Sequence, residues 1–466
     1  MDSHASVQRM LTRRSFLGRA SLGLGALAAA GLSRDGGGPP HHPARIRRVI
    51  FLCMAGGPSQ FETFDWKPQL EKMDGQPMPP SFTAGQPIAQ LQGKKLKVLR
   101  PLCNFGRHGE SGQMIGDYLP WTAKLADDIA IIRSMHTTQI NHDPAHTVMN
   151  TGTAISGRPS MGSWVTYGLG SEANDLPGFV VLTSVKGRNP QPIASRQWHS
   201  GFLPSRFQGV EMQSTGDPVH YLSNPPGVTR HRQREVVDAI GALDRLRNAG
   251  VQDPEVDTRL SQYELAFRMQ RSAPKLMDFR DEDPRVLEMY GAKGMDGSFT
   301  ANCLLARRLA ERGVRFIQLY HRGWDHHGDL DKWMKVCCGA TDRATWALVA
   351  DLKQRGLLDD TLVVWGGEFG RTPMFQGKGK TPGRDHHIKG FSMWLAGGGI
   401  RPGITHGTTD ELGYHAVEDR VSVHDLHATI LWLLGIDSDR FTHPFQGLDM
   451  KLTGVEPSRV VREVLA

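Results

Sequence analysis

Three short segments rich in histidine and acidic residues occur in order along the second half of the chain. They are Gly323-Trp324-Asp325-His326-His327, Gly366-Gly367-Glu368-Phe369-Gly370-Arg371 and Gly383-Arg384-Asp385-His386-His387. Carboxylates and neutral imidazoles are common protein ligands of divalent transition metals. The three segments therefore predict a metal site, with polar loops that bind no metal as the alternative.

The first two segments each follow an apolar run that is typical of a β-strand. These runs cover residues 315–319 and 361–365. In an open α/β sheet, the segments that leave the carboxyl ends of the strands meet in one crevice. Residues that are far apart in the sequence are therefore expected to converge there.

Four residues of these segments are the first candidates for metal ligands. If residues 325–327 are extended, Asp325 and His327 point to the same side, and Glu368 and His386 would complete the set. Such a mixture of oxygen and nitrogen ligands suits Zn²⁺, Mn²⁺ or Ca²⁺, and the imidazoles disfavour Mg²⁺.

Arg371 follows Glu368 by one short turn-prone segment. The planar guanidinium group of an arginine can bind two oxygens of a phosphate or sulfate group. We therefore expect Arg371 to hold an anionic ester. The alternative is a salt bridge that orients Glu368.

Other apolar runs alternate with amphipathic ones along the chain. Strand-like runs cover residues 48–54, 129–132, 179–182 and 391–396, and helical patterns cover 300–312, 340–354 and 422–434. Nearly unbroken apolar strands are typical of a parallel sheet that is covered on both faces. Residues from about 225 to 298 are charged and helix-prone, which predicts a helical insertion.

The first thirty residues have the pattern of an export signal. Arg13-Arg14 precede a short apolar stretch rich in glycine and alanine, which is typical of the twin-arginine route. The stretch is too short to span a membrane comfortably. We therefore expect a signal peptide over residues 1–30, a flexible linker over 31–44, and a periplasmic or secreted protein with no stable membrane span after cleavage.

Charge and cysteine content argue against other classes of protein. The signal segment holds Arg9, Arg13, Arg14 and Arg19 against Asp2, so it carries +3 of the formal net charge of +7 and leaves +4 on the rest. So small a surplus predicts no nucleic-acid binding. The five cysteines are an odd number without a CxxC spacing, which indicates neither a disulfide framework nor a thiolate zinc site.

Several motifs together resemble the exported bacterial proteins grouped as domain of unknown function 1501. The motifs are Gly56-Gly57-Pro58-Ser59, the three segments above, and the stretch from Gly407 to Leu431. That family is sulfatase-like and belongs to the alkaline phosphatase superfamily. The resemblance implies an alkaline phosphatase/sulfatase-like α/β domain over residues 45–466, with a mixed, mostly parallel sheet sandwiched between helices. It also implies one or two metals at the carboxyl ends of the strands.

The resemblance also assigns roles to individual residues. Asp325, His327 and His386 are similar to the metal ligands of the superfamily, and Glu368 occupies the place of an aspartate ligand. Phe369 replaces a histidine, which questions a second metal. The aspartate expected after the first strand is missing, unless Glu62 or Asp65 takes its place.

The nucleophile of the sulfatases has no counterpart in this chain. The segment from His142 to His146, with Thr151-Gly152 after it, is similar to the sulfatase signature, but His142 stands in place of the cysteine and His146 in place of the arginine. Formylglycine therefore cannot form there. Either His142 attacks and forms a phosphohistidine-type intermediate, or His142 is a ligand or base and water attacks.

The sequence thus predicts an exported, metal-dependent hydrolase of sulfate or phosphate esters. Its substrate would be a small-molecule or polysaccharide anionic ester, with His142 or His146 providing proton transfer or nucleophilic attack. The alternative is a secreted, non-catalytic protein of the same fold that binds a polysaccharide or a protein partner.

Overall fold

The computed structural model describes residues 40–185, 190–219, 222–378 and 380–466. The predicted signal peptide and residues 31–39 of the predicted linker lie outside the described residues.

A nine-stranded sheet forms the centre of the molecule, in the order β14-β4-β13-β8-β1-β7-β5-β6 with β17 beside β4. Its strands are β1 (Arg48–Ala55), β4 (Ile129–His136), β5 (Phe179–Thr183), β6 (Val210–Met212), β7 (Phe316–Arg322), β8 (Thr361–Gly366), β13 (Phe391–Gly397), β14 (Ile404–His406) and β17 (Val421–Ser422). Within the described residues, β13 runs antiparallel to both of its neighbours and the other pairs of this sheet are parallel. The prediction of a mixed, mostly parallel sheet is confirmed.

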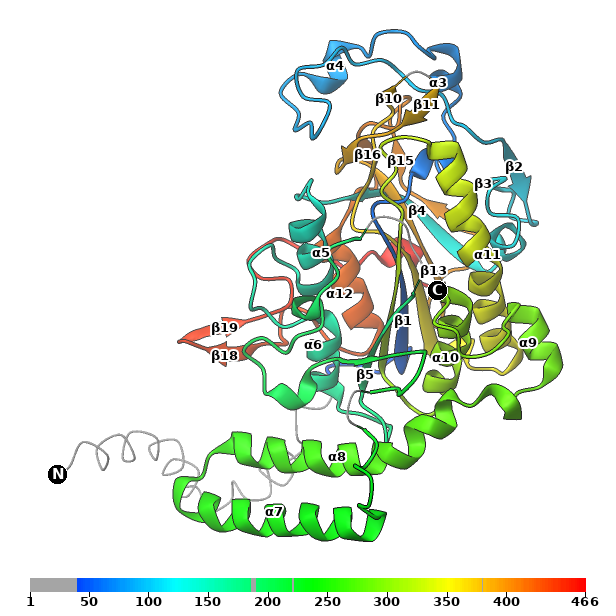
Figure 1. Cartoon of the computed structure of the whole chain (residues 1–466). Coiled ribbons are helices and arrows are strands. Elements are labelled where there is room, and N and C mark those ends of the chain that lie inside the picture. The colour runs from blue at the N-terminus through cyan, green and yellow to red at the C-terminus, as the bar shows by residue number, and fades with distance from the viewer. Residues whose placement is uncertain (1–39, 186–189, 220–221, 379) are drawn as a thin grey trace.

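Helices cover both faces of this sheet (Figure 1). One face packs on α10 (Phe299–Glu311) and α11 (Leu330–Gln354), and the other on α5 (His142–Thr151), α6 (Met161–Leu169) and α12 (Val423–Leu433). Every residue of β1 is buried, and alternate residues enter the two cores: Ile50 and Leu52 on the α10 side, Phe51 on the α12 side. This burial on both faces explains the unbroken apolar runs of the sequence.

The observed helices agree with the expected ones except at the start of α11. A capping box begins α12, with the side chains of Ser422 and Asp425 each accepting from the backbone N–H of the other. Helix α11 begins at Leu330, well before the predicted residue 340. Its first turns bury Leu330, Met334 and Cys338 on one side, and the charged residues between them hide this stripe in the sequence.

A pair of long helices extends beside the main body (Figure 1). The segment predicted as a helical insertion contains α7 (Arg230–Val251), α8 (Pro254–Met277) and α9 (Pro284–Tyr290). We call the α7–α8 hairpin the helical arm. Of the helices in the described part of the chain, none combines the length and the apolar composition needed to cross a membrane.

The remaining short elements lie outside the central sheet. They are α3 (Pro68–Lys72), α4 (Pro80–Thr83), β2 (Phe105–His108), β3 (Gln113–Gly116), β9 (Gly370–Arg371), β10 (Gln376–Lys378), β11 (Thr381–Gly383), β12 (His386–His387), β15 (Thr408–Thr409), β16 (Ala416–Glu418), β18 (His443–Phe445) and β19 (Leu448–Met450).

The reversed direction of β13 matters for the candidate site. Asp325 and Glu368 follow the carboxyl ends of the parallel strands β7 and β8, whereas His386 precedes β13. Because β13 is antiparallel to β8, its amino end lies at the same edge as the carboxyl end of β8. His386 therefore arrives at the edge where the other candidate ligands lie.

Candidate metal centre at the carboxyl edge of the sheet

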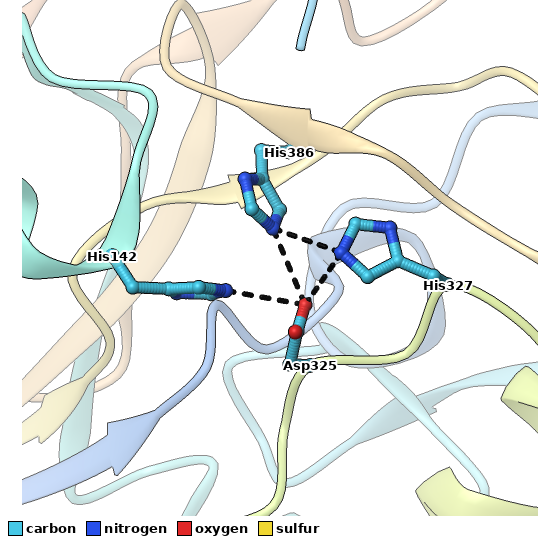
Figure 2. A group of neighbouring side chains, drawn as sticks. All are labelled: His142, Asp325, His327 and His386. Carbon is cyan, nitrogen blue, oxygen red and sulfur yellow. Dashed lines mark hydrogen bonds and ion pairs between the residues drawn. The ribbon is translucent and has the colours of Figure 1, made fainter. Parts of the chain in front are cut away.

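Three predicted site histidines converge on one carboxylate oxygen of a fourth predicted site residue, Asp325. Asp325 Oδ1 lies 3.2 Å from His142 Nε2, 2.9 Å from His327 Nε2 and 3.3 Å from His386 Nε2 (Figure 2). Each residue offers one potential ligand atom, and these atoms all lie within 4.8 Å of one another. The structure thus brings together residues from α5, the β7 loop and β12.

Hydrogen bonds on the far side of each imidazole fix which nitrogen faces the cluster. His386 Nδ1 lies 2.9 Å from the carbonyl oxygen of Ile140, which can only accept, so this nitrogen carries the hydrogen. By the same reasoning, His327 Nδ1 donates to Gln376 Oε1 at 2.6 Å. This assignment of the tautomers leaves a lone pair on Nε2 of both rings.

A cation between these lone pairs would relieve their repulsion. The Nε2 atoms of His327 and His386 lie only 3.0 Å apart, and both face the negative oxygen of Asp325. His142 Nε2 is buried and faces the same oxygen at 3.2 Å. Lone pairs and a carboxylate oxygen that converge in this way repel one another unless a proton or a metal ion lies between them. The donor set therefore fits a divalent metal.

The charges of the cluster shift the pKa values of its members. Burial opposes ionisation of Asp325, but its close contacts with His142, His327 and His386 and the charge of Arg371 hold its pKa far below the usual range. Burial lowers the pKa of His386 to about 4, so this imidazole is neutral at pH 7. Burial would also lower the pKa of His142, but its bonds to Asp325 and Glu368 raise it above the ordinary value.

Glu368 lies behind His142 rather than beside Asp325. Its carboxylate accepts from His142 Nδ1 at 2.6 Å and from the backbone N–H groups of Gly56 at 3.1 Å and Gly57 at 3.3 Å. Burial alone would raise its pKa, but the charge of His146 and the bond from His142 lower it to about 2. A carboxylate that binds the outer nitrogen of a ligand histidine fixes that ring and strengthens it as a ligand.

His146 stands one helical turn after His142 and completes a second group of potential ligands with His142 and Glu368. Its Nε2 lies 3.4 Å from Glu368 Oε1. Both of its ring nitrogens are buried without a hydrogen-bond partner among the described residues. Since His142 directs Nδ1 to Glu368 and Nε2 to Asp325, it links the two groups.

Phe369 packs against the imidazoles of the cluster. Its ring centroid lies 4.9 Å from that of His142 and 4.7 Å from that of His386. The residue that replaces a histidine of the superfamily pattern therefore supports two ligands from the side and provides none.

Two glycines after β1 allow the loops to approach closely. Gly56 has φ +124°, and a methyl group there would lie 2.5 Å from the backbone nitrogen of Asp325. Gly57 has φ +71°, and a methyl group there would lie 2.7 Å from the Phe369 ring. Only glycine combines these conformations with so little space.

Arg371 is fully buried, and its contacts differ from the expected ones. It donates to Asp325 Oδ1 at 2.6 Å and to the backbone carbonyl oxygens of Gly56, Gly57, Trp324 and Arg384. Its guanidinium nitrogens are thus occupied by protein oxygens, and no side of the group faces outward to hold an anionic ester. The geometry matches the alternative of an orienting salt bridge, although the partner is Asp325 and not Glu368.

The acids considered as substitutes for the missing aspartate lie outside the cluster. Asp65 accepts from Thr409 Oγ1 at 2.5 Å and pairs with Lys67 at 3.2 Å. Glu62 binds Arg384, with both side chains fully buried and 2.8 Å between their closest atoms. Asp65, predicted as a possible ligand, therefore does not belong to the groups of converging ligand atoms, and local partners hold its carboxylate.

Two glutamines that the sequence did not single out support His327. Gln376 Oε1 accepts from its Nδ1, Gln376 Nε2 donates to Gln90 Oε1 at 3.0 Å, and Gln90 Nε2 lies 3.1 Å from His327 Nε2. Neither glutamine lies in a histidine-rich segment. Only the folded arrangement of the 86–97 loop and β10 reveals them.

Part of the cluster can be reached from solvent. The side chains of His142, Asp325 and His327 are 15%, 17% and 22% exposed, whereas Glu368 and His146 are fully buried. An ion held by the first group would therefore have an outer side that water or a substrate can approach.

The family of the chain follows from its sequence. The model of the family described as "Protein of unknown function (DUF1501)" matches residues 46–465. The chain belongs to this family. The resemblance inferred from its motifs is thereby confirmed. No curated protein matches the sequence.

Solved structures that align with this one include three proteins of low sequence identity. A protein in the alkaline phosphatase superfamily from Vibrio parahaemolyticus is 11% identical, with a TM-score of 0.36 over 85% of this chain and 68% of that chain. The PsFucS1 sulfatase from Pseudoalteromonas sp. is 14% identical, with a TM-score of 0.35 over 98% and 76%. Ps i-CgsB in complex with k-i-k-neocarrahexaose is 10% identical, with a TM-score of 0.37 over 84% and 72%.

Proposed function

We propose that this protein is an exported, metal-dependent hydrolase of sulfate or phosphate esters. The observation that carries the proposal is the convergence of three imidazole Nε2 atoms on Asp325 Oδ1, within 3.3 Å of it. Three nitrogen ligands and one oxygen ligand favour Zn²⁺ or Mn²⁺ over Ca²⁺, which prefers oxygen ligands alone.

A bound transition metal lowers the pKa of a water ligand and stabilises negative charge on an ester oxygen. The residues of this chain orient and tune such an ion. Glu368 holds the His142 ring, Gln376 holds the His327 ring, and Arg371 holds Asp325. The exposed side of the cluster is where an anionic ester would approach.

His142 acts as a ligand in this proposal and not as the nucleophile. Its two nitrogens face Glu368 at 2.6 Å and Asp325 at 3.2 Å. Neither nitrogen is directed to the outside, as attack on an ester would require. Direct attack by water is therefore the favoured route, and His146, buried beside Glu368, is available for proton transfer within the site.

The substrate and the location of the protein rest on the sequence. The family resemblance favours a small-molecule or polysaccharide anionic ester. Export rests on Arg13-Arg14 and the apolar stretch that follows.

A second candidate function is a secreted, non-catalytic protein that binds a polysaccharide or a protein partner. The observation that favours it is His142 at the place of the sulfatase nucleophile, together with the absence of any cysteine between Cys103 and Cys303. In that case the metal would stabilise the fold and perform no chemistry.

Metal content and turnover together separate these functions. We expect the purified protein to hold about one equivalent of Zn²⁺ or Mn²⁺ by elemental analysis, and to hydrolyse 4-nitrophenyl sulfate or 4-nitrophenyl phosphate. His327→Ala removes a partly exposed ligand, so both metal content and turnover should fall. His231→Ala is the control, since His231 is an exposed residue of α7.

The possible outcomes decide between the two candidates. Bound metal without turnover in the wild type would favour the non-catalytic protein. A wild type without metal and without turnover would refute the hydrolase proposal.

A further inference from the structure

A hollow of about 490 Å³ lies where the helical arm meets the body of the protein. Five cationic side chains and one acidic residue line it: Arg230, Arg268, Arg271, Lys275, Arg312 and Asp175. We call it the basic hollow. No other residue of its lining is charged.

The basic hollow lies at the opposite edge of the sheet from the candidate metal centre. Asp175 precedes β5, and Arg312 is the residue that ends α10 ahead of β7. The amino ends of β5 and β7 therefore border it, whereas Asp325 follows the carboxyl end of β7. The two sites are separated by the length of a strand and do not share residues.

The cations of the basic hollow are only partly balanced by acidic side chains, namely Asp175 in its lining and Glu264 near Arg268. None of the five takes part in an ion pair among the residues that the structure describes. Elsewhere on the same arm, Arg234 pairs with Asp238 and with Glu264. Five like charges around one hollow repel one another, and a bound anion would relieve that repulsion.

The cations are arranged on three helices that face one space. Arg268, Arg271 and Lys275 lie on one side of α8, since residues three and four apart are neighbours on a helix. They extend over about 10 Å of the helix at 1.5 Å per residue. Arg230 at the start of α7 stacks on Phe267 at 4.3 Å, and Arg312 donates to the carbonyl oxygen of Ser272 at 3.5 Å.

We propose that the basic hollow binds a polysaccharide chain that carries sulfate or phosphate groups. Guanidinium groups match the geometry of these oxyanions. Charges spread along 10 Å of helix suit several anionic groups on one chain better than a single small ion. The lining contains no aromatic residue on which a base could stack, which disfavours single-stranded nucleic acid. This binding site does not depend on the metal centre.

A pair of matched double variants tests the proposal. Arg271→Gln with Lys275→Gln removes two cations of the basic hollow, whereas Arg247→Gln with Arg259→Gln removes two cations from α7 and α8 outside its lining. All four side chains are exposed, so both variants are expected to fold. An unchanged metal content and a melting temperature no lower than that of the wild type would verify this.

Binding is measured by calorimetry with dextran sulfate, with dextran phosphate, with uncharged dextran and with a single-stranded DNA oligonucleotide. For the wild type we expect dextran sulfate or dextran phosphate to bind more tightly than the oligonucleotide, and uncharged dextran not to bind. The ratio of the two Kd values identifies which oxyanion the hollow prefers. The hollow variant should bind the preferred polymer about tenfold more weakly or worse, and the control variant within about twofold of the wild type.

Two outcomes would overturn the proposal. An equal loss of affinity in both variants would show that binding reflects overall charge and not this hollow. Binding of the oligonucleotide as tight as that of the charged dextrans would show a general site for polyanions.

Discussion

The two edges of the central sheet differ in whether their cationic side chains are paired with carboxylates. At the carboxyl edge, buried arginines are neutralised by carboxylates and backbone carbonyls, as Arg371 is by Asp325 and Arg384 by Glu62. At the amino edge, four of the five cations of the basic hollow are exposed, and none of the five has an ion pair among the described residues. The first arrangement fixes side chains around a space that suits a cation, and the second leaves side chains free to meet an anion. Removing a charge should therefore lower stability at the carboxyl edge but not at the amino edge.

The largest effect is expected from breaking the buried pair behind the metal centre. Glu62→Gln would leave the charge of Arg384 buried without a counter-charge, which costs about 3–5 kcal/mol of unfolding free energy. Urea denaturation measures this cost. Arg280→Gln is the control. Arg280 is exposed and pairs with Asp278 at the surface, so its loss should change the unfolding free energy little.

The double variant Glu62→Gln with Arg384→Met refines this test. If the loss arises from an unpaired buried charge, removing the arginine as well should restore part of the stability. A single variant that unfolds at the wild-type urea concentration would contradict the view that the carboxyl edge depends on compensated charge.

The next largest effect should come from a substitution at Gly56, where the loop after β1 approaches the loop after β7 closely. Gly56→Ala would place a methyl group 2.5 Å from Asp325 N in a backbone conformation of positive φ, so we expect a loss of about 3 kcal/mol or more, together with loss of bound metal. Gly75→Ala is the control, because Gly75 has φ +73° but nothing within 4 Å of the added methyl group. Equal losses in both variants would mean that backbone strain alone, and not crowding, sets the cost.

These residues also show how far the sequence could predict the structure. The strands were predictable because burial on both faces requires unbroken apolar runs such as that of β1. A parallel sheet brings the segments that follow its strands to one edge, and so the meeting of Asp325 and His386 could be predicted. The direction of β13 could not be read from its residues, since an apolar strand looks the same in either direction.

The supporting residues of the site were the hardest to predict. Gln376 and Gln90 lie in loops without a recognisable pattern, and a glutamine becomes a partner of His327 only through long-range folding. Arg371 was assigned to a substrate because its type suits an anion. Its full burial, which decides its role, depends on three other segments of the chain, around Gly56, Asp325 and Arg384, and cannot be read from the sequence.

A smaller effect is expected from removing one of those supporting residues. Gln376→Ala takes away the acceptor of the His327 Nδ1 hydrogen, and the loss of such an outer partner typically weakens metal binding by about 10–100-fold. Competition with a chromophoric chelator measures the affinity. Gln262→Ala, an exposed glutamine of α8, is the control and should bind metal as the wild type does. Metal affinity unchanged in Gln376→Ala would argue that His327 is not a ligand.

The smallest effect on stability should come from removing cations of the basic hollow. Whether stability rises or falls tests the difference between the two edges of the sheet. Arg271→Gln with Lys275→Gln relieves repulsion among like charges, so at low salt we expect the unfolding free energy to rise slightly, by up to about 0.5 kcal/mol. Added salt screens that repulsion, so the gain should shrink at 1 M NaCl. A loss of stability would mean that these cations are compensated after all, and the two edges would then follow the same rule. Suppose that the unfolding free energy rises in the hollow variant and falls strongly in Glu62→Gln. The charges at the carboxyl edge then stabilise the fold, whereas those at the amino edge do not, as expected of side chains that bind a ligand.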